Sequence, residues 1–422
     1  MIEVKINDAK LQHAAEAGMD EFVKAFVDAI REAIGGELTA ETMAQLNSDQ
    51  ITLLAWDILH EEMMDGGMVQ LIHNGYGAFL WKNPTDKAFK NWGLTELSKL
   101  IKKSHFLYKT NHEEIERDLT SADFSGILTK GGTILGSSRQ PFKLMRVPDE
   151  NGLDKVEAMK QNYYKLNLDC LVILGGNGTQ KTANLLREEG LNVVHLPKTI
   201  DNDIYGTDVT FGFQSAINIA CDAIDCIHTT AASHNRVFIV EVMGHKVGWL
   251  TLYAGMASGA DIILLPEIPY DIDKVIQKIE DRDKKGCRFT IIAVAEGAIS
   301  KEDAALTKKD YKKKMEKYPF PSVSYEVAAQ IQEKTGREVR VTVPGHMQRG
   351  GSPCPYDRVF ASRLGSEAGK LILDNQYGFM VGYKNREIVR VPLEDVAGKL
   401  KTVDPDATIV QEAKMLGICF GD

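Results

Sequence analysis

The sequence predicts an α/β protein with a parallel sheet, preceded by an all-helical segment. Residues 1–118 place apolar side chains at helical spacing, whereas from about residue 120 short apolar runs alternate with helical stretches. Short apolar runs without alternation are typical of parallel strands that are covered on both faces. We therefore expect an acidic helical segment at 1–118 and an α/β region at 119–422 that contains two similar subdomains.

Length and composition indicate a globular protein. The chain has 422 residues, of which 44% are hydrophobic and 26% are charged. No apolar run reaches the roughly 18–20 residues that cross a bilayer, and the start, MIEVKINDAK, has no apolar signal core. The six cysteines lack CxxC or zinc spacing, which favours reduced, buried thiols. We expect a cytoplasmic protein with no membrane partner.

Most of the negative charge lies in the helical segment. The formal net charge is -9, and residues 1–118 hold 12 Lys and Arg against 20 Asp and Glu, compared with 38 against 39 in the rest. Because phosphate neutralisation needs a basic surface, we expect no nucleic-acid partner. The acidic segment is either a solvated helical surface or a face that meets a basic protein.

This segment is predicted to be mostly helical, and MVQLIHNGYGAFLW (68–81) is predicted to form a helix, a turn and a second helix. Phe22, Phe26, Ile30 and Ile34 recur every four residues before the glycine pair at 35–36. Residues 50–64 form another strong helix, and residues 94–117 form a long last one. No catalytic spacing occurs among them.

The α/β region contains a series of strand-like runs, and helical stretches separate them. They are CLVILGG (170–176), VVHLP (193–197), VFIVEVMG (237–244), IILLPE (262–267), FTIIAVAEG (289–297) and VRVTVPG (339–345). Parallel sheets of this kind bind ligands outside the carboxyl ends of their strands.

The first of these strands leads into a glycine-rich turn and a helix, LVILGGNGTQKTANLL. Gly175, Gly176 and Gly178 allow the backbone to approach an anion, and a helix N-terminus offers free N–H groups to phosphate. The run is neither a P-loop nor a GxGxxG motif, so an ordinary strand-to-helix turn stays an alternative.

The second strand ends in a dense polar loop, PKTIDND (197–203). One of its two carboxylates suits proton abstraction from a hydroxyl, and the other suits a metal. The alternative is a charged turn with an aspartate helix cap. Further along, Arg236 precedes a strand, and Arg340, His346 and Arg349 follow one another through VRVTVPGHMQRGGSP. Several cations near a glycine loop favour a phosphorylated sugar over unrelated surface residues.

In this order, GGNGT, PKTIDND, RVFIVEVMGH, AEG and PGHMQRGGSP resemble the 6-phosphofructokinase family, from about Phe124 to Asp422. The resemblance implies phosphoryl transfer to the 1-hydroxyl of fructose 6-phosphate, with Mg²⁺ as cofactor and ATP or pyrophosphate as donor.

The resemblance also implies a role for each matching position. Asp201 would be the general base, with Thr199, Asp203 and Lys198 beside it. The donor would lie against Arg139, Gln140, Gly176, Asn177, Gly178 and Thr179. The sugar phosphate would lie against Thr199, Ile200, Asp201, Met243, Gly244, His245, Glu296, His346, Met347, Gln348 and Arg349. A neighbouring subunit would supply Arg236 and Arg340, which implies a homo-oligomer.

The chain departs from the family pattern at three places. Asn177 stands where the family has its magnesium-linked aspartate. Gly178 leaves room for ATP at a position where pyrophosphate-dependent members commonly carry Asp. Lys198, in contrast, resembles a residue of the pyrophosphate-dependent enzymes. We give Gly178 more weight, which favours ATP as the donor. The family's N-terminal donor loop has no counterpart before GGTILGSSRQPF, so the fold is expected to be incomplete at that end.

The segment LLAWDILHEEMMDGGMVQLIHNGYGAFLWKNP resembles the DNA-mimic protein family, which is small, helical and acidic. This likeness implies a third hypothesis, beside those of an ATP-dependent and a pyrophosphate-dependent enzyme. The chain would then be an inactive sugar-phosphate-binding fusion whose acidic segment binds a DNA-binding protein.

Overall fold

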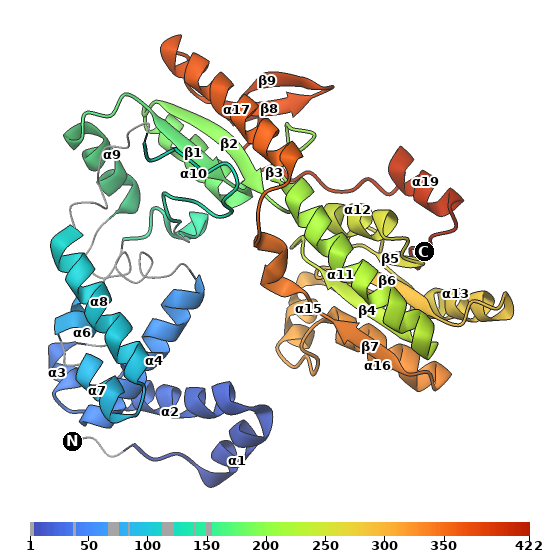
Figure 1. Cartoon of the computed structure of the whole chain (residues 1–422), viewed down its shortest axis with the longest axis horizontal. Helices are drawn as coiled ribbons and strands as arrows, with labels where there is room; N and C mark the ends of the chain where they lie inside the picture. The colour runs from blue at the N-terminus through green and yellow to red at the C-terminus, as the bar shows by residue number, and fades with distance from the viewer. Residues whose placement is uncertain are drawn as a thin grey trace. The chain divides into compact units, whose positions relative to one another are not determined.

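The computed structural model describes residues 4–36, 39–65, 76–82, 85–111, 122–137, 140–148 and 154–422. Contacts divide the chain into two units. One comprises Met1–Ser125 and Thr133–Arg139, and the other Gly126–Gly132 and Gln140–Asp422. The α/β architecture lies in the second unit, and its elements carry the labels of Figure 1.

The described residues of the first unit form helices and no strands. The helices are α1 (Asp8–Ala17), α2 (Met19–Ala33), α3 (Ala40–Met43), α4 (Ser48–Asp65), α6 (Gly77–Lys82), α7 (Thr85–Asn91) and α8 (Thr95–Asn111). Ile30 and Ile34 are buried with Leu54 of α4, as the four-residue spacing predicted. The predicted helices that fall on described residues are therefore present, whereas residues 68–75 and 112–117 lie outside the described residues.

The first sheet of the second unit has the strand order β1-β2-β8-β9, with β3 paired to β2. Its strands are β1 (Leu171–Gly175), β2 (Val193–Thr199), β3 (Phe211–Gly212), β8 (Phe379–Lys384) and β9 (Glu387–Pro392). The sequence did not predict β3, β8 or β9, and the last two form an antiparallel hairpin. Asn385 and Arg386 make its two-residue turn with positive φ angles of 50° and 70°, and only the asparagine is a usual turn signal.

The outer strand β1 departs from the expectation that both faces are covered. Leu171 and Ile173 pack against a buried cluster that includes Val193. On the opposite face, Val172 and Leu174 are 39% and 41% exposed. Among the described residues β1 pairs on one side only, with β2, so it is an edge strand with an apolar face toward solvent.

The second sheet is parallel throughout, with the order β5-β6-β4-β7. Its strands are β4 (Val237–Val242), β5 (Ile262–Leu264), β6 (Thr290–Ala295) and β7 (Val339–Thr342). Successive side chains of β4 enter different cores: Phe238 and Val240 join one cluster, and Val237 and Ile239 join the other. This sheet is thus covered on both faces, as its unbroken apolar runs predicted.

Helices separate most of these strands, as expected for parallel connections. They are α9 (Lys155–Lys165), α10 (Asn177–Glu188), α11 (Phe213–His234), α12 (Trp249–Ala257), α13 (Ile272–Lys284), α14 (Lys301–Ala304), α15 (Lys308–Met315), α16 (Val323–Thr335), α17 (Pro355–Leu373), α18 (Leu393–Val396) and α19 (Thr408–Met415), with short 3₁₀ turns η2 (Phe142–Leu144) and η3 (Gly345–Arg349). Figure 1 shows α17 running beside the β8–β9 hairpin, and α11 lying beside β4.

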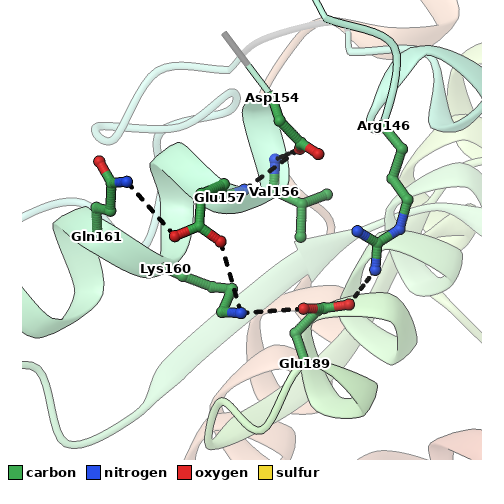
Figure 2. A network of polar contacts seen from close by, with 7 residues as sticks. All are labelled: Arg146, Asp154, Val156, Glu157, Lys160, Gln161 and Glu189. Atoms are coloured by element: carbon green, nitrogen blue, oxygen red, sulfur yellow. Dashed lines mark hydrogen bonds and ion pairs between the residues drawn. The ribbon is translucent and has the colours of Figure 1, made fainter.

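Polar contacts attach α9 to the end of α10 (Figure 2). The Asp154 carboxylate caps α9 by accepting the N–H group of Val156 at 2.8 Å. Glu189, just past α10, pairs with Lys160 at 3.1 Å and with Arg146. These contacts hold α9, which precedes β1, against the C-terminal end of α10.

The cysteines only partly follow the prediction. All six are free thiols. However, Cys226 and Cys287 are exposed and the other four are partly buried, because Cys226 lies on an outer turn of α11 and Cys287 follows the turn after α13. None of the described helices is both long enough and apolar enough to span a bilayer.

Candidate functional site

The glycine turn connects β1 to the N-terminus of α10. A Cβ atom on Gly175 would lie 2.4 Å from Oγ1 of Thr179, so a side chain there would collide with the first turn of the helix. Gly176 is the residue before the helix, and no side chain caps the free N–H groups there. A Cβ on Gly178 would meet nothing within 4 Å. This helix end is therefore open to an anionic ligand.

The polar loop after β2 lies directly beside this turn. Parallel pairing sets Gly175 opposite Pro197, so the carboxyl ends of β1 and β2 coincide. Thr199 Oγ1 accepts the N–H group of Asp201 at 3.1 Å, and the Thr199 carbonyl accepts the Thr210 hydroxyl at 2.7 Å. Lys198 is exposed at the strand end, and Ile200 packs against the core. Two separate motifs thus meet at one sheet edge.

Each of the two carboxylates of the loop has one oxygen atom that is held out of water. Oδ1 of Asp201 and Oδ1 of Asp203 are buried without a hydrogen-bond partner. Burial raises the pKa of Asp201, while the charge of Arg349 and the Thr199 hydrogen bond oppose that rise. Burial and then the charge of Asp201 raise the pKa of Asp203 to about 6. Groups of this kind suit proton transfer near neutral pH.

A second set of backbone groups surrounds the end of β4. The N–H groups of Gly244 and His245 both donate to Oε1 of Glu296, which follows β6, with the first bond at 3.3 Å. The Met243 N–H donates to Oε1 of the buried Gln348 at 3.2 Å. These bonds draw the end of β4, the end of β6 and η3 together.

The cationic end of η3 faces the same place. His346, Met347 and Arg349 are exposed on η3. The charges of Arg349 and His245 lower the pKa of Asp201 and the charge of Glu296 raises it. Ile200, the neighbour of Asp201, packs against a core cluster of the second sheet. The structure therefore brings together most of the residues that the sequence singled out.

Other predicted residues lie elsewhere. Arg236 and Arg340 both pair with Glu338 at the amino ends of β4 and β7, whereas the site lies at the carboxyl ends. Gln140 accepts a hydrogen bond from Lys155 at 2.8 Å. Arg139 lies outside the described residues.

The oxygen atoms of the site match what a hard cation prefers. The unpartnered oxygens of Asp201 and Asp203 lie two residues apart, and Asn177 donates through Nδ2 to the Lys399 carbonyl at 3.0 Å, which leaves its Oδ1 uncommitted to that bond. In the part of the chain that the structure describes, no three His, Cys, Asp or Glu side chains gather into a metal-binding group. Carboxylates completed by phosphate oxygens are the usual surroundings of protein-bound Mg²⁺.

Sequence reasoning missed Lys401, whose Nζ donates to Asn202 Oδ1 at 2.9 Å. Burial lowers the pKa of Lys401 to about 7, although the charges of Asp208 and Asp203 act in the opposite direction. No local pattern marks this lysine, because it lies in an irregular C-terminal stretch about 200 positions from the loop that it contacts.

Comparison with known proteins agrees with this arrangement. A family model described as phosphofructokinase matches residues 62–372. The chain is 56% identical over 313 residues to the ATP-dependent 6-phosphofructokinase of Spirochaeta thermophila. The match covers 72% of this chain and 84% of that protein. It is 48% identical over 303 residues to ATP-dependent 6-phosphofructokinase 3 of Bacteroides thetaiotaomicron, with the same coverages of 72% and 84%.

Solved structures show the same fold. The phosphofructokinase of Saccharomyces cerevisiae matches with a TM-score of 0.54 and 31% identity. The match covers 66% of this chain and 38% of the yeast chain. The pyrophosphate-dependent phosphofructokinase of Nitrosospira multiformis matches with a TM-score of 0.57 at 21% identity, over 68% of this chain and 71% of its own. With these relatives, and with the motifs at the carboxyl ends of strands in both sheets, the chain belongs to the phosphofructokinase family.

Proposed function

We propose that residues 119–422 transfer the terminal phosphoryl group of ATP to the 1-hydroxyl of fructose 6-phosphate, giving fructose 1,6-bisphosphate. One observation carries the proposal: Asp201 lies on the loop beside the glycine turn, and its Oδ1 is buried without a hydrogen-bond partner. The charges of Arg349, Glu296 and His245 influence the pKa of this carboxyl group. A base so placed contacts a donor on one side and a sugar phosphate on the other.

Positioning and electrostatics supply most of the rate in such a reaction. The sugar's O1 attacks the terminal phosphorus, the bond to the bridging oxygen of ADP breaks, and the hydroxyl proton passes to the Asp201 carboxylate. The N–H groups at the start of α10 stabilise charge on the donor phosphates. Arg349 and His346 bind the 6-phosphate, while Glu296 holds the Gly244–His245 backbone that shapes the sugar site.

ATP is the favoured donor because space is open beside Gly178, where a carboxylate would repel the inner phosphate of ATP. The names of the relatives from Spirochaeta thermophila and Bacteroides thetaiotaomicron also specify ATP. Lys198 is exposed at the strand end and favours pyrophosphate as the second candidate, which is the donor named for the Nitrosospira multiformis protein.

Mg²⁺ would be held by Asp201 or Asp203 together with Asn177 and the donor phosphates, where it would neutralise the charge that develops on the transferred group. Because Asn177 brings an amide oxygen and no charge, we expect the donor phosphates to supply much of the affinity for the ion.

The positions of Arg236 and Arg340 support our proposal that the enzyme is a homo-oligomer. β4 is 6 residues long, so its first and last residues lie about 17 Å apart at ~3.3 Å per residue. Arg236 lies before the amino end and cannot reach the Gly244 site of its own subunit. We propose that both arginines bind the sugar phosphate of a neighbouring subunit, and that the enzyme acts in the cytoplasm.

The test is ADP release that depends on both fructose 6-phosphate and Mg²⁺, measured in parallel with pyrophosphate as donor. Asp201→Asn should lower kcat by about 10²–10⁴-fold, with a small change in KM for the sugar, because it removes the proton acceptor. Asp406→Asn, an exposed carboxylate, is the control and should leave kcat unchanged. Absence of turnover with either donor would refute the activity, and an unchanged kcat in Asp201→Asn would refute the base assignment.

A further inference from the structure

A C-terminal strap, residues 399–403, links the polar loop to the second sheet. Leu400 forms an antiparallel bridge with Ile204, and the Lys401 N–H donates to the Asp203 carbonyl at 2.9 Å. The Trp249 indole N–H, on α12, donates to the Lys401 carbonyl at 3.0 Å. The strap therefore holds the loop from one side and the second sheet's helix from the other.

The Lys401 side chain extends into the loop itself. Its ammonium group donates to Asn202 Oδ1 at 2.9 Å, to the Thr207 carbonyl at 3.0 Å and to the Asp208 carbonyl at 2.8 Å. The Trp249 ring lies 5.5 Å from the same nitrogen. An ammonium group has three N–H donors, and here each has its own oxygen acceptor.

Asn202 is the residue through which this anchoring reaches the carboxylates. It stands between Asp201 and Asp203, and its φ of 55° is in the left-handed region. Its side chain also accepts the Thr210 N–H at 3.1 Å and donates to the Asp208 carbonyl at 3.3 Å. A left-handed residue turns the two flanking side chains in directions that depend on its own backbone angles, so whatever holds Asn202 orients both aspartates.

We propose that Lys401 is a positioning residue: by tethering Asn202 and the carbonyls of Thr207 and Asp208, it holds Asp201 in line with the sugar hydroxyl. This inference rests on the proposed function. Loss of the tether leaves the sugar-binding groups on β4, β6 and η3 in place, so it lowers kcat and spares KM. A displacement of a reacting group by about 1 Å can lower the rate by up to about 10²-fold.

The experiment compares Lys401→Met with the wild-type chain and with Thr402→Val, an exposed neighbour on the same strap. We expect kcat of Lys401→Met to fall about 10–100-fold with KM for fructose 6-phosphate changed less than about threefold, while Thr402→Val stays within about twofold of wild type. In kcat, Lys401→Met combined with Asn202→Ala should lose less than the product of the two single fold-losses, because both substitutions remove the same Lys401–Asn202 hydrogen bond.

Each outcome separates this inference from the proposed function. No turnover by the wild-type chain refutes the function. If the wild-type chain turns over and kcat of Lys401→Met is unchanged, the positioning role is refuted. It is also refuted if the fold-loss in kcat of the double variant equals the product of the two single fold-losses. If Lys401→Met does not fold, Lys401→Gln, which keeps two N–H donors without the charge, is judged by the same criteria. Failure of both variants to fold overturns the proposal, since Lys401 would then serve the fold alone.

Discussion

Replacing Asp203 with asparagine tests the electrostatic description of the loop through stability. Asp203 is 9% exposed, and burial together with the charge of Asp201 raises its pKa from 3.8 to about 6. Each unit of pKa difference between the folded and unfolded states corresponds to 1.36 kcal/mol, so the ionised carboxylate destabilises the folded chain by about 3 kcal/mol.

The direction of the pH dependence follows from the raised pKa. Below pH 3.8 the carboxyl is protonated in both states, and its burial carries no charge penalty. As pH rises through about 6, the folded state must also give up its proton, and the stability that protonation supplied is lost. Asp203→Asn should therefore be more stable than wild type by up to about 3 kcal/mol at pH 7.5, and the gain should shrink toward zero near pH 4.

The assay is urea unfolding followed by tryptophan fluorescence in EDTA, at several pH values from 4 to 8. Asp406→Asn, which changes an exposed carboxylate, serves as the matched control and should shift the midpoint little at any pH. A gain that is the same at pH 4.5 and pH 7.5, or no gain at pH 7.5, would show that Asp203 is not held at a raised pKa.

Three further substitutions test other parts of the structure. Gly178→Asp should lower kcat/KM for ATP at least about tenfold and spare pyrophosphate, because its side chain would enter open space beside the donor phosphates; equal loss with both donors would contradict the donor assignment. Gly244→Ala should raise KM for the sugar, since a Cβ there would lie 2.5 Å from the Val247 carbonyl at a φ of 151°, and an unchanged KM in steady-state kinetics would argue against it. Phe213→Ala should destabilise the chain by about 3–5 kcal/mol in denaturant unfolding, because Phe213 is 1% exposed and stacks edge-on with Tyr253; a loss under about 1 kcal/mol would mean that the core refills the space.

Local patterns predicted much of the fold because the second sheet is assembled from elements with strong signals. The apolar runs at 237–244 and 289–297 became β4 and β6, and both are covered on both faces. The β8–β9 hairpin was missed because its turn, Asn385–Arg386, has only one residue that favours positive φ. The exposure of one face of β1 could not be predicted either, because it depends on which other elements cover the strand and not on the strand's own residues.

The sequence by itself determined which chemical groups are present: the glycine turn at 175–178, the two aspartates of PKTIDND and the cations of GHMQRGG, each in an order that indicates a family. Tertiary structure alone decided what they do to one another. Strand pairing placed Gly175 beside Pro197, burial raised the pKa of Asp203, and Lys401 was brought to Asn202 across the chain. Residue types fix donors, acceptors and charges, but distance and desolvation set their energies, and both arise only when segments far apart in sequence pack together.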